Sequence, residues 1–198
     1  KIEDLKDYCK KNKIKSAGLS DTSNLCGSLE FSENLSKSGT QPIIGTQILF
    51  NFKNEIGLLP LIAKSEVGYK KIVQLSSKSY LNNKDKLDPL CEIEDLLSDQ
   101  EGVILLSGSI NGLIGKLFKK GKLSEIEELY KLVYENYKDN FYIEIQRHKD
   151  HNERSFENFN LNLSKKLNIP IIATQEIYYL DKSMHDAHEA LICIGQKT

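Results

Sequence analysis

Short apolar runs alternate along the chain with segments in which apolar residues recur every three or four positions. The runs predict β-strands, because buried parallel strands are short and continuously apolar. These predicted strands cover residues 16–20, 42–50, 58–63, 103–107, 141–146 and 170–174. The recurring pattern predicts amphipathic helices, over residues 2–11, 24–37, 66–80, 124–137, 155–167 and 187–194. Strand–helix alternation with short links favours an α/β fold with a mainly parallel sheet or a barrel, with a flavodoxin-like open sheet as the alternative.

Local signals refine several of these elements. Ser65 is a candidate N-cap for the third helix, and Ser124 with Glu127 matches a capping box. Residues 58–63 can pair with 42–50 across a polar turn, although Pro60 favours an edge position. Both Cys26 and Cys193 are expected in helix cores.

Composition restricts the protein class. The chain has 198 residues, 39% hydrophobic and 28% charged, with a formal net charge of -1. These values predict one globular domain over residues 1–198, and they argue against disorder and against a broad basic clamp for nucleic acid. Four cysteines without a close pair suggest a reducing, cytoplasmic compartment. No apolar run is long enough for a membrane span, and no signal peptide is recognisable.

Candidate chemistry lies where the predicted strands end, since parallel α/β folds place their sites there. Of the residues at these ends only Asp21, His148 and Glu176 can act as metal ligands or acid–base groups. The other residues there are Thr22, Gln47, Leu58, Ser109 and Tyr178. We therefore expect Asp21, Gln47, Ser109, His148 and Glu176 at one end of a barrel whose strands 16–20, 42–50, 103–107, 141–146 and 170–174 are parallel.

Each candidate also has a structural interpretation. His148 and Glu176 are more simply a hydrogen-bonded polar remnant than a metal or acid–base pair, with Arg147 a candidate partner for Glu176. Asp21 can cap the helix near residue 24, together with Ser23.

Two further patterns are weak. His185 and His188 have a spacing that can bind zinc, but no third ligand is evident. The glycine-rich stretch at 107–112 lacks the Walker lysine, so a tight turn is the better interpretation.

Seven segments in order carry a family resemblance. The first, Ser20-Asp-Thr-Ser-Asn-Leu-Cys-Gly27, resembles the Thr-Asp-His-Gly-Asn-Leu-x-Gly stretch of the polymerase and histidinol phosphatase (PHP) domain. The others are Gly39–Gly45, Leu61–Tyr69, Gly102–Gly108, Phe141–His148, Asn168–Thr174 and Asp186–Gly195. Together they resemble the version of this domain at the N-terminus of the alpha subunit of bacterial replicative DNA polymerase III.

The resemblance implies a distorted (β/α)7 barrel. Family members open with a strand that bears a His-x-His pair, whereas Lys1 here already lies in a predicted helix. The resemblance thus implies that the first strand is missing and that the chain is a fragment of a much longer polymerase subunit. An open sheet edge should then make it less stable than a chain that begins one strand earlier.

The resemblance also implies a trinuclear metal cluster in members with an intact site, and this sequence departs from it. Thr22 occupies the position of a histidine ligand, Gln47 that of a glutamate and Leu58 that of a histidine. In the same way Ser109 replaces a cysteine, and Glu176 and Tyr178 replace an Asp-x-His pair. His148 alone matches. Thr, Gln, Leu, Ser and Tyr do not replace anionic or imidazole ligands, so the metal site is expected to be vestigial.

The implied function is that of a structural and interaction module of a DNA-directed DNA polymerase, with no catalytic, cofactor-binding or metal-binding residue in this chain. Family relatives suggest a proofreading exonuclease and a sliding clamp as partners, DNA contacts and magnesium in other domains, and no membrane. Two alternatives remain: an active metal-dependent phosphoesterase or 3′–5′ exonuclease of the same fold, and a stand-alone α/β enzyme.

Overall fold

A computed structural model describes residues 1–81, 88–98 and 100–196. The strands are β1 (Ser16–Thr22), β2 (Gln41–Phe52), β3 (Glu55–Ala63), β4 (Leu90–Glu92), β5 (Val103–Leu106), β6 (Phe141–Ile145) and β7 (Ile171–Ala173). The helices are α1 (Ile2–Lys11), α2 (Ser28–Lys37), α3 (Glu66–Leu81), α4 (Ile93–Leu97), α5 (Leu113–Lys119), α6 (Leu123–Tyr137), α7 (Glu153–Leu167) and α8 (His185–Gln196). Short 3₁₀ helices cover Lys138–Asn140 and Lys182–Met184.

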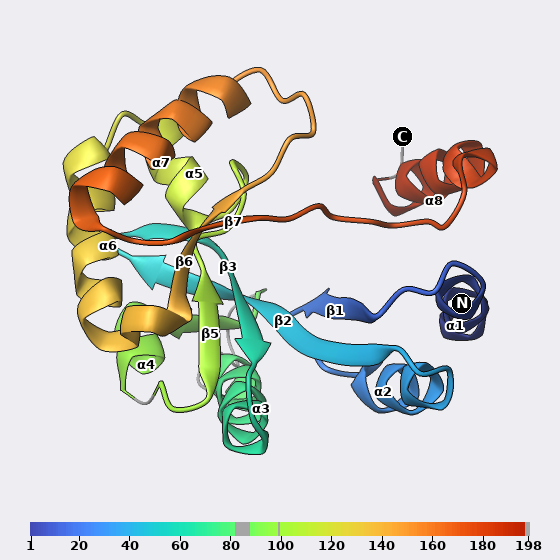
Figure 1. Ribbon diagram of the computed structural model, residues 1–198. Helices are drawn as coiled ribbons and strands as arrows, with labels where there is room; N and C mark the ends of the chain where they lie inside the picture. The colour runs from blue at the N-terminus through green and yellow to red at the C-terminus, as the bar shows by residue number, and fades with distance from the viewer. Residues whose placement is uncertain (82–87, 99, 197–198) are drawn as a thin grey trace.

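The strands form one curled sheet in the order β1-β2-β3-β5-β6-β7, with β4 beside β2 (Figure 1). Strand β1 is parallel to β2, β5 to β6, and β6 to β7. Because β3 is antiparallel to both β2 and β5, the five strands predicted to be parallel all run in one direction. The structure therefore confirms the predicted α/β class with a curled, barrel-like sheet.

Strands β2 and β3 form the expected hairpin, which turns at Lys53 and Asn54, both with positive φ. Its second strand lies between β2 and β5, so the expectation that Pro60 marks an edge strand was wrong. Pro60 is tolerated because it pairs only with Gln47, and the ladder to β5 starts at Leu61. A missing backbone N–H at this position thus interrupts no bond to β5.

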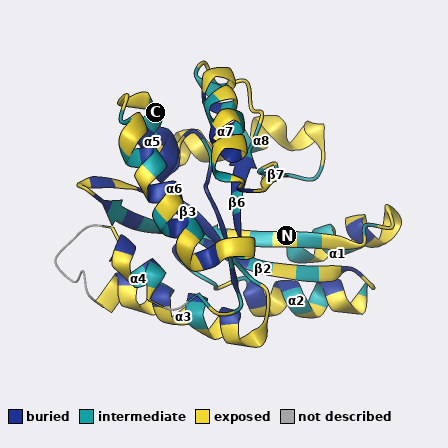
Figure 2. Ribbon diagram, turned by 60° about the vertical axis from the view of Figure 1, so that its left-hand side comes forward, coloured by how far each residue is buried: buried dark blue, intermediate teal, exposed yellow. Residues whose placement is uncertain are grey.

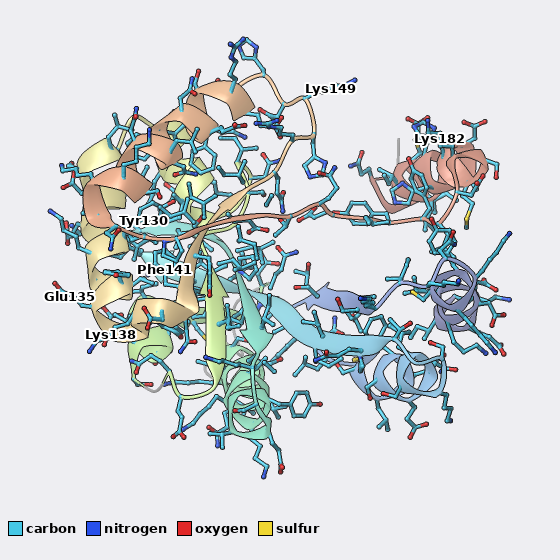
Figure 3. The ribbon with its side chains drawn as sticks, in the orientation of Figure 1. Tyr130, Glu135, Lys138, Phe141, Lys149 and Lys182 are labelled. Carbon is cyan, nitrogen blue, oxygen red and sulfur yellow. The ribbon has the colours of Figure 1, made fainter. Side chains whose placement is uncertain are left out.

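The main hydrophobic core lies between the central strands and helices α3 to α7. Figure 3 shows Tyr130 of α6 beside Phe141 of β6, and their rings meet edge to face with centroids 5.6 Å apart. Helix α8 contributes nothing to this core, because none of its residues is buried (Figure 2). It lies beyond a long extended segment after β7, away from α5, α6 and α7 (Figure 1).

The observed helix starts confirm one expected cap and contradict another. Ser65 does cap α3, since its Oγ accepts the Gly68 N–H at 3.2 Å. The capping box at Ser124 was wrong: α6 already begins at Leu123, and Glu127 instead binds Lys131 and Lys166.

The region before α2 also differs from the prediction. Helix α2 begins at Ser28, because Asn24 holds a turn by bonding the carbonyl of Thr22 and the N–H of Cys26. Asp21 and Ser23 therefore do not cap a helix at residue 24. Cys26 and Cys193 are exposed, so their expected core placement was wrong.

No helix among the described residues combines the length and the apolar character that crossing a bilayer requires.

Candidate functional site

A cavity of about 350 Å³ opens where the parallel strands β5, β6 and β7 end. Its walls come from four segments: the loop after β5, the end of β6 with its following loop, the first turns of α7, and the segment after β7. Ser109, His148, Glu176 and Tyr178 all line it, so the fold brings together four of the candidate positions found in the sequence.

The other four candidate positions lie on the first strands of the sheet. Asp21 and Thr22 end β1, where Thr22 is paired with Gln47 of β2, and Leu58 lies on β3 opposite Leu49. None of these is among the residues that line the cavity. The structure thus divides the predicted site into a cavity group and a group on β1 to β3.

His148 and Glu176 each form a hydrogen bond with a neighbouring side chain and not with one another. The Gln175 amide lies 3.0 Å from His148 Nδ1, and because this amide nitrogen can only donate, Nδ1 is the acceptor. The Tyr178 hydroxyl donates to Glu176 Oε2 at 2.5 Å. This bond, with burial and the carboxylate charge, raises the pKa of Tyr178 to about 12.

Arg147 does not pair with Glu176 as expected. It donates from Nε and Nη2 to the two oxygens of Glu157 on α7, at 3.0 and 2.7 Å. A two-pronged bond of this kind fixes the guanidinium against one carboxylate. It fastens the end of β6 to α7 at the outer side of the cavity.

The loop between β6 and α7 is shaped by Glu153. Its carboxylate accepts the backbone N–H of His148 at 2.5 Å and that of Lys149 at 2.9 Å. Lys149 has a positive φ of 69°, and Figure 3 shows it on this loop. The glycine-rich stretch after β5 is a turn, as predicted, with Gly108 at φ 82° and the Ser109 hydroxyl accepting the Asn111 N–H at 3.3 Å.

Glu144 on β6 is a site residue that the sequence reasoning missed. It lines the cavity but is only 4% exposed. Its Oε1 accepts from Thr174 and from Gln146, whereas its Oε2 has no hydrogen-bond partner among the described residues. Burial raises the pKa of Glu144, and the charge of Glu176 acts in the same direction. A glutamate inside the apolar run 141–145 was the available signal.

Asn160 on α7 was missed in the same way. It is 1% exposed, and its Oδ1 accepts the Tyr130 hydroxyl at 3.0 Å. Its Nδ2 finds no partner in the part of the chain that the structure describes. An amide at helical spacing between Phe156 and Leu163 was the signal in the sequence.

The cavity does not fit a metal cluster. Within residues 1–81, 88–98 and 100–196, no three His, Cys, Asp or Glu side chains come together to hold a metal ion. Ser109 and Tyr178 supply neutral hydroxyls, and a phenol with a raised pKa is a poor anionic ligand. A cluster of divalent ions needs several anionic or imidazole ligands at once.

Neither histidine of α8 lines the cavity. His185 approaches Asp186 at 3.3 Å and Glu189 at 3.7 Å. The ring of His188 stacks on Tyr178 with centroids 5.4 Å apart. Tyr178 thereby links α8 to the rim of the cavity.

Comparisons with known proteins give relatives of one kind. A DNA polymerase III subunit alpha from Rickettsia bellii is 40% identical over 180 residues, which are 89% of this chain and 15% of that protein. The same subunit from Vibrio cholerae is 32% identical over 179 residues, again 89% of this chain and 15% of the relative. The chain thus spans about one sixth of the length of these curated relatives.

A solved structure supports the fold. The crystal structure named as a metal-dependent phosphoesterase from Bifidobacterium adolescentis matches with a TM-score of 0.53 and 10% identity, over 88% of this chain and 80% of that one. The family model described as PHP domain matches residues 1–148. That match covers β1 to β6 of the curled sheet and reaches His148 at the cavity, and it shows that the chain belongs to the PHP domain family.

Proposed function

We infer that residues 1–198 form a single PHP domain of a longer DNA polymerase III alpha subunit, and that this domain acts as a structural and interaction module without metal chemistry of its own. The relatives named as that subunit support the polymerase assignment. The pairing of β6 with β7 supports extending the domain past the family match at residue 148, because the sheet continues there.

The main support for the inactive role is that the candidate metal ligands in the cavity are already hydrogen-bonded to protein groups. His148 Nδ1 and Glu176 Oε2 are both occupied by protein donors, and Ser109 and Tyr178 stand beside them. Two competent ligands with neighbours of this kind do not offset the charge of a divalent ion in a partly buried site.

In this proposal, other parts of the longer subunit carry out the polymerase reaction. Its catalytic carboxylates and the magnesium ions they would hold lie outside residues 1–198, as do the contacts to DNA and to a sliding clamp. The role of this domain is then to support the polymerase body and to present a surface to other subunits.

The best candidates for that surface are the segment after β7 and helix α8. Several large apolar side chains are exposed there, including Ile177 at 77%, Leu191 at 66% and Ile194 at 75%. Exposed apolar groups on neighbouring elements are typical of protein–protein contacts. A proofreading exonuclease is the partner that this proposal assigns to them.

Metal analysis tests the inactive role. After dialysis, the purified protein should contain well under one equivalent of zinc, manganese or iron, because most ligands of the cluster are replaced. His148→Ala should leave the metal content unchanged. Stoichiometric metal in the wild-type protein, lost in His148→Ala together with a phosphoesterase activity, would show that the domain is an active enzyme instead.

Binding analysis tests the interaction role. Sedimentation of the chain with the proofreading exonuclease from the same genome should show a complex, and Ile177→Asp with Leu191→Asp should weaken it. Val73→Asp on α3, where Val73 is 37% exposed, serves as the matched control. Equal weakening by both changes would contradict the assigned surface while leaving the metal test unaffected.

A further inference from the structure

We propose that the turn leading from α1 into β1 carries a binding surface for the phosphodiester backbone of single-stranded nucleic acid. Residues 10–15 contain four exposed lysines and no acidic residue. These side chains form the lysine cluster: Lys10, Lys11, Lys13 and Lys15. This contact is additional to the DNA contacts of the polymerase reaction, which are assigned to other parts of the longer subunit, and it involves neither the cavity nor α8.

The charge of the lysine cluster is not neutralised by the folded domain. The acidic residues of α1 lie nearer its start, where Glu3 and Asp7 each approach Lys6 at 3.6 Å. In the described part of the chain, no ion pair or hydrogen bond involves an ammonium group of the cluster. Because the whole chain has a formal net charge of -1, the positive charge is a local concentration on an otherwise acidic molecule.

The helix end explains only half of the lysine cluster. Lysines in the last turn of a helix interact favourably with its exposed carbonyl groups, and Lys10 and Lys11 occupy that turn of α1. Lys13 and Lys15 lie beyond the C-cap at Asn12. Lys13 also has a left-handed backbone with a φ of 54°, which favours glycine, so the helix end by itself does not select a lysine there.

Backbone hydrogen bonds hold the lysine cluster on a fixed frame. The Ile14 N–H donates to the Cys9 carbonyl at 3.0 Å and closes the turn after α1. The Thr40 hydroxyl donates to the Ile14 carbonyl at 2.9 Å. The Gln41 N–H donates to the Lys15 carbonyl at 2.8 Å. The cluster thus lies where β1 and β2 begin, at the end of the molecule away from α5, α6 and α7 (Figure 1).

An aromatic ring accompanies these charges. Tyr8 is 42% exposed, and it precedes Lys11 by three residues, so the two side chains are neighbours on the surface of α1. Bases of a single strand stack on exposed aromatic rings largely irrespective of their identity. In a duplex the faces of the bases are already covered by neighbouring base pairs. A ring among unpaired lysines therefore favours a single strand.

The composition of the surface favours nucleic acid over an acidic protein segment. Lysine is depleted in protein–protein interfaces, whereas it is a usual partner of nucleic-acid phosphates. Within residues 8–15, all of which the structure describes, Tyr8 is the only exposed large apolar side chain. A protein partner therefore finds little apolar surface to bury here. Because a lysine ammonium is a point charge without a fork of donors, we expect binding that does not depend on base sequence.

Fluorescence anisotropy of the chain with a labelled oligothymidylate tests the surface. With four phosphate contacts, log K should fall against log salt concentration with a slope of about −3, since single strands give about −0.7 per contact. Lys13→Gln with Lys15→Gln should reduce this slope to about half and weaken binding at least about fivefold at low salt. Lys70→Gln with Lys131→Gln removes the same charge from exposed ion pairs on α3 and α6, and it should leave slope and affinity nearly unaltered.

Changes at Tyr8 test the preference for a single strand. Tyr8→Leu should weaken oligothymidylate binding about fivefold or more, because stacking is lost, whereas Tyr8→Phe should retain it. A duplex of the same length should not respond to either change. If Tyr8→Leu alters binding of neither the single strand nor the duplex, the cluster attracts polyanions in general and the proposal is overturned.

A polyglutamate peptide tests the competing class of partner. It should displace the labelled oligothymidylate much more weakly than the unlabelled oligothymidylate does. Displacement of equal strength would assign the surface to an acidic protein segment and overturn the proposal. Equal losses in the Lys13/Lys15 variant and in its control, or binding without salt dependence, would overturn it as well. Circular dichroism shows whether the variants fold, and the substituted lysines are all exposed, so the lysine variants decide if a Tyr8 variant does not fold.

Discussion

Glu144 shows how a single buried carboxyl can set the pH response of the domain. Its side chain is 4% exposed, and burial raises its pKa above the ordinary value for glutamate. The folded protein therefore binds this proton more tightly than the unfolded chain does. The resulting stabilisation is complete below the ordinary pKa of glutamate, and it is lost as the pH rises through the raised pKa of the folded state.

Glu144→Gln should abolish this pH dependence, because a glutamine imitates the protonated acid at every pH. Relative to the wild-type protein, the variant should gain stability as the pH rises from the ordinary pKa of glutamate through the raised pKa of the folded state. Urea unfolding across that range measures the effect. Glu135→Gln on the exposed side of α6 is the control. Parallel pH profiles for Glu144→Gln and the wild-type protein would contradict the assignment.

At the scale of elements, the packing of α3 against the turn before β5 depends on two glycines. A Cβ added to Gly68 would lie 1.7 Å from the carbonyl oxygen of Gly102, which is backbone and cannot rotate away. Gly102 in turn has a φ of 71° and lies against the Ser65 cap. The close approach of helix and turn positions α3 over the sheet.

Gly68→Ala should therefore destabilise the domain by roughly 1–3 kcal/mol, since either the helix or the turn must move. Gly195→Ala is the matched control, because no atom lies within 4 Å of the added carbon on α8. In that helix alanine should be neutral or stabilising by up to about 1 kcal/mol. Denaturant midpoints of both variants provide the comparison, and equal losses would show that the contact is unimportant.

At the scale of the molecule, the sheet is open. Strand β1 pairs only with β2, and β7 pairs only with β6, within the residues described. Both carry unpaired backbone groups at their outer sides, which a further strand can bond. In the strand order, β1 and β7 are the first and last strands of the sheet.

A longer chain that supplies one more strand beside β1 should unfold at a higher temperature than residues 1–198. The gain comes from new ladder bonds and from burial along β1, whose residues are all exposed or half-buried. The same extension with proline in the middle of the added strand should lose most of the gain. Equal melting temperatures for all three chains would mean that the added segment does not join this sheet.

The sequence by itself determined most of the elements and the common direction of five strands, but it missed β4, α4 and α5. Apolar runs such as 103–107 and 141–146 are short and bounded by turn residues, so strand and helix periods can be separated along the chain. The family was also visible, because its seven segments occur in order. For the candidate site, sequence reasoning found the cavity positions Ser109, His148, Glu176 and Tyr178, since strand ends in parallel α/β folds converge.

Only the tertiary structure decided the partners of those residues. Arg147 pairs with Glu157 of α7 and not with Glu176. Glu127 binds Lys131 of its own helix and also Lys166 of α7, a neighbour that the sequence pattern does not reveal. Hydrogen-bond satisfaction is likewise a property of the packed chain. Nothing in the sequence marks Glu144 and Asn160 as buried polar residues. Burial against β7 and α6 leaves one atom of each without a hydrogen-bond partner among the residues that the structure describes.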